Sequence, residues 1–153
     1  MTPGEQFLGE YRDISTSQSR QRIGDAISRA TAPMGMLVRS VAKKRLEEVN
    51  PAYPSIRITR RGDLLSATFA GQSYAASTDG TPRRNVAADG CAVYVSYSVE
   101  GNTLHARYKV SDGEKRFDLT HVPGTPRLGV QVTVTSKRLP KPVLYELAYV
   151  KMP

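Results

Sequence analysis

The alternation of hydrophobic and polar residues divides the chain into a short strand, a helical block and a long run of strands. Residues 6–14 are predicted to form the first strand. Apolar residues then recur at steps of three and four, the period of a helix with one apolar face. Proline inside a helix removes a hydrogen bond and clashes with the preceding turn. We therefore predict two helices, over about 17–31 and 33–49, with Pro33 opening the second.

The remainder of the chain has the punctuation of consecutive hairpins. From Gly62 onward, glycines at turn-like positions follow one another at intervals of 9 to 12 residues, the spacing of short strands joined by tight turns. Residues such as Leu128, Val130 and Val132 alternate with polar residues, as in a strand with one buried face. Nine further strands are predicted, over about 55–61, 63–70, 72–78, 82–88, 91–99, 102–110, 114–121, 127–136 and 142–151.

These elements predict a mainly β fold in a single domain of 153 residues, with a helical insertion at about 17–49. Each hairpin places a strand beside the previous one, so the sheet is antiparallel and up-and-down. A twisted sheet of about ten strands either closes on itself or leaves two exposed edges. We expect a β-barrel, with the two helices forming a lid between strands one and two.

Several strands are apolar or aromatic on both faces, which indicates that the interior contains a cavity as well as packed core. The chain has eight tyrosines, three phenylalanines and no tryptophan. Tyrosine combines apolar area with a hydroxyl that needs a partner, so a cavity with partly polar walls is expected. Phe7 and Tyr11 are expected to close the bottom of this cavity. The candidate wall residues are Tyr94, Tyr145, Leu147 and Tyr149, and the candidate lid residues are Met34, Leu37 and Val38.

The opening segment Phe7-Leu8-Gly9-Glu10-Tyr11-Arg12, followed by Ser15, resembles the start of the fatty-acid-binding proteins. Those proteins begin F-x-G-x-W-K and continue into a helix pair led by Ser or Thr. The wider lipocalin group shares the G-x-W opening but lacks the helix pair. This resemblance implies a ten-stranded calycin barrel with a helical lid, which binds or transports a small lipid-like ligand without catalysis.

The resemblance also implies where a ligand carboxylate would be held. The family uses an Arg-x-Tyr near the end of the last strand together with a second arginine from an earlier strand. Tyr149 stands where the family tyrosine stands, but Leu147 replaces the arginine. Arg107 is the candidate for the second arginine; exposure to solvent is the alternative, because its face also carries His105 and Lys109. The departure at Leu147 favours a neutral or amphipathic ligand.

The formal net charge of +8 favours anionic partners without selecting one. The second predicted helix places Arg39, Lys43, Lys44 and Arg45 beside its apolar stripe. Such a helix can lie on an anionic membrane surface, although a solvated helix face is the simpler interpretation. Binding of an anionic polymer such as nucleic acid through the basic surface is an alternative function. It is disfavoured, because Tyr108 and Arg107 point to opposite faces of one strand and cannot combine stacking with phosphate contact.

Motifs for catalysis are absent from the sequence. It contains no P-loop, dinucleotide fingerprint, H-E-x-x-H or G-x-S-x-G element, so neither an enzyme nor a cofactor is expected. A haem held by His121 is the alternative cofactor. The single cysteine, Cys91, excludes an internal disulfide and is expected to be buried and inert. No apolar run is long enough to span a membrane and no signal-peptide core opens the chain, which leaves a soluble protein of undetermined compartment.

Overall fold

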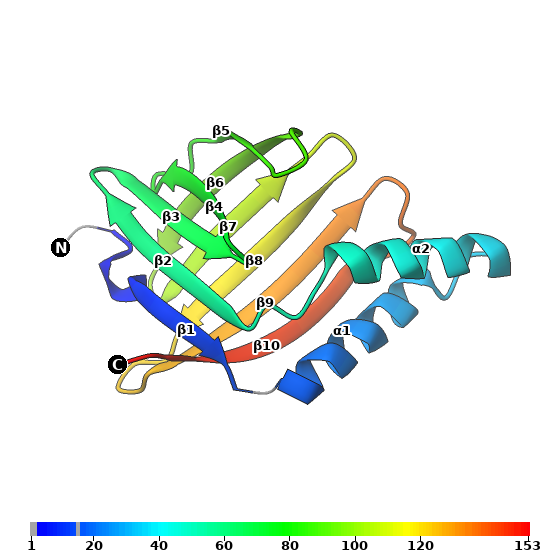
Figure 1. The fold of residues 1–153 in the computed structure, drawn as a ribbon, viewed down its shortest axis with the longest axis horizontal. Coiled ribbons are helices and arrows are strands. Elements are labelled where there is room, and N and C mark those ends of the chain that lie inside the picture. The colour runs from blue at the N-terminus through cyan, green and yellow to red at the C-terminus, as the bar shows by residue number, and fades with distance from the viewer. Residues whose placement is uncertain (1–2, 15) are drawn as a thin grey trace.

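Ten antiparallel strands form one continuous sheet in the computed structural model, which describes residues 3–14 and 16–153 (Figure 1). The sheet order is β4-β3-β2-β1-β10-β9-β8-β7-β6-β5, so almost every strand pairs with its neighbour in sequence. The pairing of β1 with β10 joins the first four strands to the last six. The strands are β1 (Gly9–Asp13), β2 (Ser55–Arg61), β3 (Leu64–Phe69), β4 (Gln72–Ser77), β5 (Arg83–Val86), β6 (Ala92–Glu100), β7 (Thr103–Lys109), β8 (Gly113–His121), β9 (Arg127–Ser136) and β10 (Val143–Lys151).

The two ends of the sheet, β4 and β5, meet through a side chain. The Asn85 amide accepts a hydrogen bond from Ala75 N–H at 3.0 Å and donates one to the Ala75 carbonyl at 2.9 Å. The amide therefore takes the place of a peptide group in the ladder. The Tyr97 hydroxyl of β6 adds a second bond across the same seam, donating to the Tyr74 carbonyl at 2.7 Å. The result is a nearly closed barrel, as the sequence predicts.

The helix pair lies between β1 and β2 and covers one end of the barrel (Figure 1). Helix α1 (Thr16–Thr31) buries Ile23, Ile27 and Ala30 and packs against β10. Helix α2 (Met36–Val49) packs on α1, but none of its described residues is buried. The two helices therefore differ in how firmly they are held. Across the described residues, neither has the combination of length and apolar composition needed to cross a bilayer.

The opening segment differs in detail from the expected first strand. Glu5–Phe7 form a short 3-10 helix before β1 begins at Gly9. Phe7 and Tyr11 are nonetheless both fully buried, and the Tyr11 hydroxyl donates to the Phe7 carbonyl at 2.9 Å. Gly9 has φ +142°, and a Cβ there would lie 2.6 Å from Lys151 Cε. The positive φ is what favours glycine here, because the end of the flexible Lys151 side chain could move away from an added Cβ.

Three further sequence expectations need correction. Pro33 does not open the second helix; it lies in the connecting turn, and α2 begins at Met36. The residue before a proline is sterically biased away from helical geometry, so α1 ends at Thr31 and the chain turns before the next helix starts. The strand expected over 82–88 is shorter, covering Arg83–Val86. Cys91 is exposed rather than buried, because it follows the turn that precedes β6.

Candidate functional site

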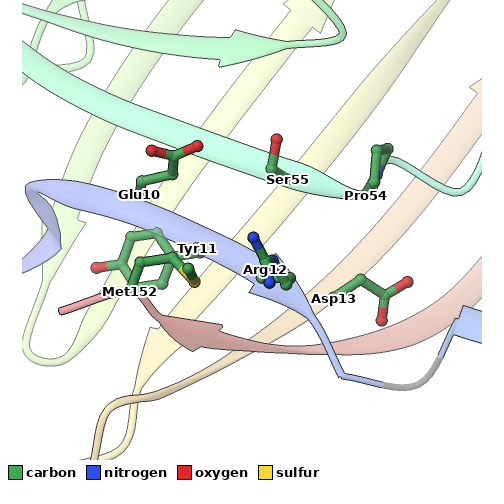
Figure 2. Close-up of a pocket in the computed structure, with 7 residues that line it drawn as sticks. All are labelled: Glu10, Tyr11, Arg12, Asp13, Pro54, Ser55 and Met152. Atoms are coloured by element: carbon green, nitrogen blue, oxygen red, sulfur yellow. The ribbon is translucent and has the colours of Figure 1, made fainter.

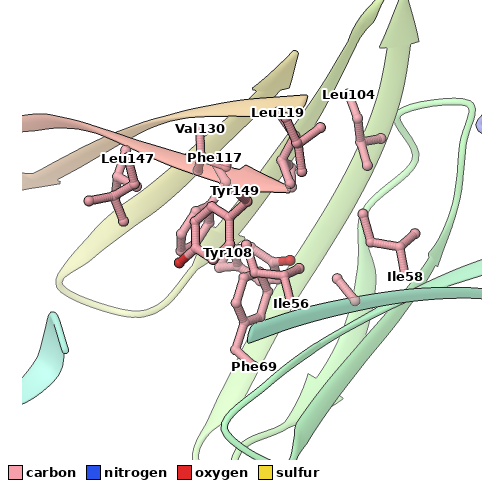
Figure 3. Packing of buried hydrophobic residues seen from close by; sticks show 14 of the residues in the cluster. Ile56, Ile58, Phe69, Leu104, Tyr108, Phe117, Leu119, Val130, Leu147 and Tyr149 are labelled. Carbon is pink, nitrogen blue, oxygen red and sulfur yellow. The ribbon is translucent and has the colours of Figure 1, made fainter. Parts of the chain in front are cut away.

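The inner face of the barrel is the candidate site, and aromatic rings occupy its middle (Figure 3). Phe69 stacks on Phe117 with ring centroids 4.9 Å apart. The same Phe69 ring meets Tyr53 at 5.2 Å and the edge of Tyr108 at 6.1 Å. Tyr74 approaches Tyr108 at 5.3 Å. These rings come from β3, β4, β7, β8 and the segment before β2, so one aromatic cluster spans the barrel.

Four of the tyrosine hydroxyls inside the barrel have hydrogen-bond partners. Tyr97 and Tyr108 share a bond of 3.1 Å between their hydroxyl oxygens. The Tyr149 hydroxyl donates to the Tyr53 carbonyl at 2.7 Å. The Tyr145 hydroxyl donates to Asn50 Oδ1 at 3.3 Å, where α2 ends. Burial removes water from these phenols and raises the pKa of Tyr97, Tyr145 and Tyr149 above the ordinary value. The interior is therefore apolar, with neutral hydroxyls at fixed places.

A lysine also belongs to this interior, and our sequence analysis did not identify it. Lys115 pairs in register with Tyr108 and with Val134, and its ammonium lies 5.3 Å from the ring centroids of both Tyr53 and Phe117. It donates a hydrogen bond of 3.1 Å to the carbonyl of Val49, the last residue of α2. Alternation along β8 carried the signal, because positions 115, 117 and 119 share one face and the last two are buried.

Three predicted wall residues lie together on the inner face of β10. Tyr145, Leu147 and Tyr149 are buried, with at most 5% of each side chain exposed. Figure 3 shows Leu147 and Tyr149 in the same buried cluster as Val130 of β9 and Phe117 of β8. Leu147 stands opposite Val130, so the position of the family arginine is occupied here by apolar packing.

The other predicted site residues are placed elsewhere. Tyr94 on β6 is 48% exposed, and Arg107 on β7 is exposed on the outer face, 4.0 Å from Glu114. Met34 is half-buried in the turn between the helices. Leu37 and Val38 are 84% and 60% exposed on α2, so in this structure they do not form the underside of a lid. The structure therefore brings together the β10 residues but not the remaining candidates.

The surface pockets formed by the described residues include the following two. One, of about 290 Å³, lies along β1 and the start of β2, where Glu10, Arg12 and Ser55 surround it (Figure 2). The other, of about 370 Å³, lies on the outer face of β6, β7 and β8 and is lined by polar residues that include His105 and Arg107. Neither is lined by Tyr145, Leu147 or Tyr149. The inner-face side chains are packed against one another instead.

The two histidines occupy different surroundings. His105 Nδ1 lies 2.6 Å from Asp118 Oδ1, and its Nε2 lies 3.5 Å from Glu100, all on the outer face. Arg116 also bonds Asp118, at 3.2 Å. His121 is half-buried at the end of β8, where its backbone N–H bonds the Asn102 carbonyl. The described residues contain no group of three or more His, Cys, Asp or Glu side chains placed to hold a metal ion.

Known proteins resemble this chain in fold but not in sequence. No protein-family model matches the sequence, and no curated protein matches it either. Solved structures match over nearly the whole chain. The chain has the fold of the fatty-acid-binding proteins. Sequence identity to these structures is below 17%, so the likeness concerns the fold alone.

Three solved structures illustrate the likeness. A protein described as the REP1-NXSQ fatty acid transporter is 14% identical, covers 97% of both chains and has a TM-score of 0.58. Fatty-acid-binding protein 1 of Echinococcus granulosus is 16% identical, with 97% of this chain and 99% of that one covered and a TM-score of 0.55. A secretory abundant heat soluble protein of Ramazzottius varieornatus is 14% identical, with 97% of both chains covered and a TM-score of 0.61. Two of the three names describe fatty-acid binding or transport.

Proposed function

We propose that this protein binds a small hydrophobic or amphipathic molecule, lipid-like in character, on the inner face of the barrel, and that it catalyses no reaction. The observation that carries the proposal is the tyrosine-rich apolar interior beneath α2, a helix without any buried residue among those described. The names of two fold relatives, a fatty acid transporter and a fatty-acid-binding protein, support the same ligand class.

Entry of a ligand requires the interior to rearrange. The buried residues on the inward faces of the strands are at most 7% exposed, so ring–ring contacts fill the space that a ligand would use. Each ring contact is worth only about 0.5–1.5 kcal/mol beyond the area it buries, and a ligand chain restores that burial at about 25 cal/mol per Å². Because α2 buries none of its described residues and packs only the partly buried Leu46 against the core, its displacement exposes little apolar surface. Opening at α2 is therefore the least costly route inward.

The first prediction concerns ligand binding itself. Protein purified under native conditions is expected to release a lipid on organic extraction, detected by mass spectrometry. The delipidated protein is expected to bind the neutral fluorophore N-phenyl-1-naphthylamine and to lose it when lipid extract is added. Leu147→Phe enlarges an inward side chain and should weaken fluorophore binding severalfold, because a close-packed interior resists added volume.

The matched control uses the same strand. Leu144→Phe makes the same change at an outward position that is 47% exposed, so fluorophore binding should match the unmodified protein. Thermal denaturation of both variants verifies that they fold. Absence of both extractable lipid and displaceable fluorophore would show that the barrel is not a carrier.

We further propose that α2 meets an anionic membrane surface during ligand exchange. Leu37 and Val41 are 84% and 70% exposed, and the spacing i, i+4, i+7 and i+8 places Lys44 and Arg45 on the same face of the helix. An exposed face that combines apolar and basic side chains suits the boundary between lipid head groups and acyl chains. The apolar and the basic side chains of this face therefore both favour binding to an anionic membrane surface.

The second prediction tests this surface with vesicles. Binding to vesicles of phosphatidylcholine with phosphatidylglycerol should exceed binding to phosphatidylcholine alone and should fall with added salt. Each basic residue near an anionic surface contributes about 1 kcal/mol, so Lys44→Glu with Arg45→Glu should reduce partitioning at least about tenfold. Arg83→Glu with Arg84→Glu makes the same charge change on exposed positions of β5 and should reduce it much less. Equal losses in the two double variants would contradict a specific role for α2.

A further inference from the structure

Lys115 is a cation on the inner face of the barrel, at the end that the helices cover. Its neighbours along the strand on that face, Phe117 and Leu119, are buried core residues. Two aromatic rings, from Tyr53 and Phe117, lie within 5.3 Å of the ammonium. Lys115 is half-buried, and the partial loss of water around its ammonium lowers its pKa to about 8. Such a position is unfavourable for the charged side chain unless an acceptor compensates for the lost water.

Lys115 has one hydrogen-bond acceptor within the protein and no carboxylate partner among the described residues. An ammonium has three hydrogens to donate. One is donated to the Val49 carbonyl at the exposed end of α2, which leaves two for solvent or for a ligand. The helix end carries a partial negative charge but no full one. None of the ion pairs found among the described residues includes Lys115. The closest carboxylates along α2, on Glu47 and Glu48, are exposed.

We infer that Lys115 binds the anionic head group of the ligand, a carboxylate on a single apolar chain, and that binding transfers the ammonium from the Val49 carbonyl to that carboxylate. The inference rests on the proposed carrier function and specifies its ligand. A charge-assisted bond between ammonium and carboxylate is roughly twice as strong as a bond to a neutral acceptor. The head group thus takes over the bond that fastens α2 to β8. The apolar chain extends among the rings of the aromatic cluster, which include Phe69 and Tyr108.

This arrangement couples loading to the lid. In the empty protein the bond from Lys115 to Val49 joins the barrel to the last turn of α2. When the carboxylate replaces that carbonyl, the last turn loses its fastening to the barrel. Amide hydrogen exchange in residues 45–49 should therefore be faster with decanoate bound than in the empty protein. Decan-1-ol has no charge, so it should leave the bond and the exchange rate unchanged.

The third prediction compares decanoate with decan-1-ol as competitors of bound N-phenyl-1-naphthylamine at pH 7. The unmodified protein should bind decanoate at least about tenfold more tightly than Lys115→Met does, whereas both should bind decan-1-ol equally. Lys115→Arg keeps the charge and should retain the preference for decanoate. Lys109→Met removes an exposed lysine from β7 and is the matched control, with no expected change.

The pH profile gives an independent readout. Lys115 is charged below its pKa of about 8 and neutral above it, so decanoate affinity should fall as the pH rises from 7 to 9.5. The titratable groups that face it are Tyr53 and Tyr108, from the segment before β2 and from β7. Burial raises the pKa of both, so neither acquires charge in this range. Lys115→Met should remove the pH dependence, and the affinity for decan-1-ol should be flat throughout.

The outcomes separate this inference from the carrier proposal. If decanoate and decan-1-ol both displace the fluorophore and Lys115→Met changes neither, the carrier stands and the head-group inference is wrong. If the fluorophore, decanoate and decan-1-ol all fail to bind, both the carrier proposal and the head-group inference are wrong. If decanoate depends on Lys115 but slows exchange in residues 45–49, the coupling to α2 is wrong.

Discussion

Phe69→Ala is expected to destabilise the protein by about 3–5 kcal/mol, the range for removing a buried phenylalanine ring. Phe69 is 5% exposed on β3, and its ring contacts those of Tyr53, Tyr108 and Phe117. Removing it leaves a cavity at the centre of the aromatic cluster and ends a contact between opposite sides of the barrel. Urea denaturation followed by far-UV circular dichroism measures the change as a shift in midpoint at constant slope.

Two further variants serve as controls for the destabilisation expected of Phe69→Ala. Phe69→Leu keeps most of the volume and should cost less than the alanine variant, because only ring contacts and part of the area are lost. Val86→Ala removes apolar atoms from a residue that is 51% exposed on β5 and should change stability by at most about 0.5 kcal/mol. If Phe69→Ala cost no more than Val86→Ala, the ring would not be part of a close-packed interior.

The β architecture could be predicted because strands that are buried on one face leave a clear record in the sequence. The predicted ranges 55–61 and 127–136 coincide with β2 and β9, where buried and less buried residues alternate. Evenly spaced turn glycines then gave the order of pairing, since short hairpins join only neighbouring strands. Side-chain closure by Asn85 left no comparable pattern, because one amide in a short strand has no periodicity.

The helical block shows the limit of periodicity. The apolar stripe through Ile27 and Leu37 predicted helices on both sides of Pro33, and both exist. The period identifies an apolar face, but it does not reveal whether anything packs on it. Ile27 is fully buried against the barrel, whereas Leu37 is 84% exposed. That difference arises from tertiary contacts, chiefly between α1 and β10, which a local pattern does not encode.

For the candidate site, side-chain alternation correctly predicts which residues of β10 and β7 share a face. It placed Tyr145, Leu147 and Tyr149 on one face, and the structure puts that face inward. It also separated Arg107 from Tyr108, which is buried. Lys115 was overlooked because charge suggested solvent, although its position two residues before Phe117 assigns it to the inner face. Family resemblance directed attention to the arginine positions, at Leu147 and Arg107, and away from this lysine.

Alkaline pH is expected to unfold the protein, because its interior tyrosines resist ionisation only while folded. Burial raises the pKa of Tyr11 to about 12 and raises those of other inward tyrosines. The affected buried residues are Tyr11, Tyr97, Tyr108, Tyr145 and Tyr149. In the unfolded chain each phenol titrates near about pH 10. Above that value the folded state holds more protons than the unfolded state, so stability decreases as the pH rises.

The magnitude follows from the number of phenols that share this behaviour. Each contributes a loss of about 1.4 kcal/mol per pH unit between its unfolded and folded pKa. Five such groups together remove about 7 kcal/mol by about pH 11, which is comparable to the whole stability of a typical domain. Lys115 acts in the opposite sense at lower pH. Its folded pKa of about 8 lies below the ordinary value, so stability should rise from pH 8 toward pH 10 before the tyrosines reverse the trend.

Urea denaturation at intervals from pH 7 to pH 11.5 measures both limbs of this profile. Tyr145→Phe removes one interior phenol and should make the alkaline decline shallower, whereas Tyr94→Phe changes a tyrosine that is 48% exposed and should leave the slope unaltered. Lys115→Met should abolish the rise below pH 10 while keeping the decline above it. A stability that stays constant up to pH 11.5 would mean that the interior phenols already ionise as readily as exposed ones, and therefore that water reaches the centre of the barrel.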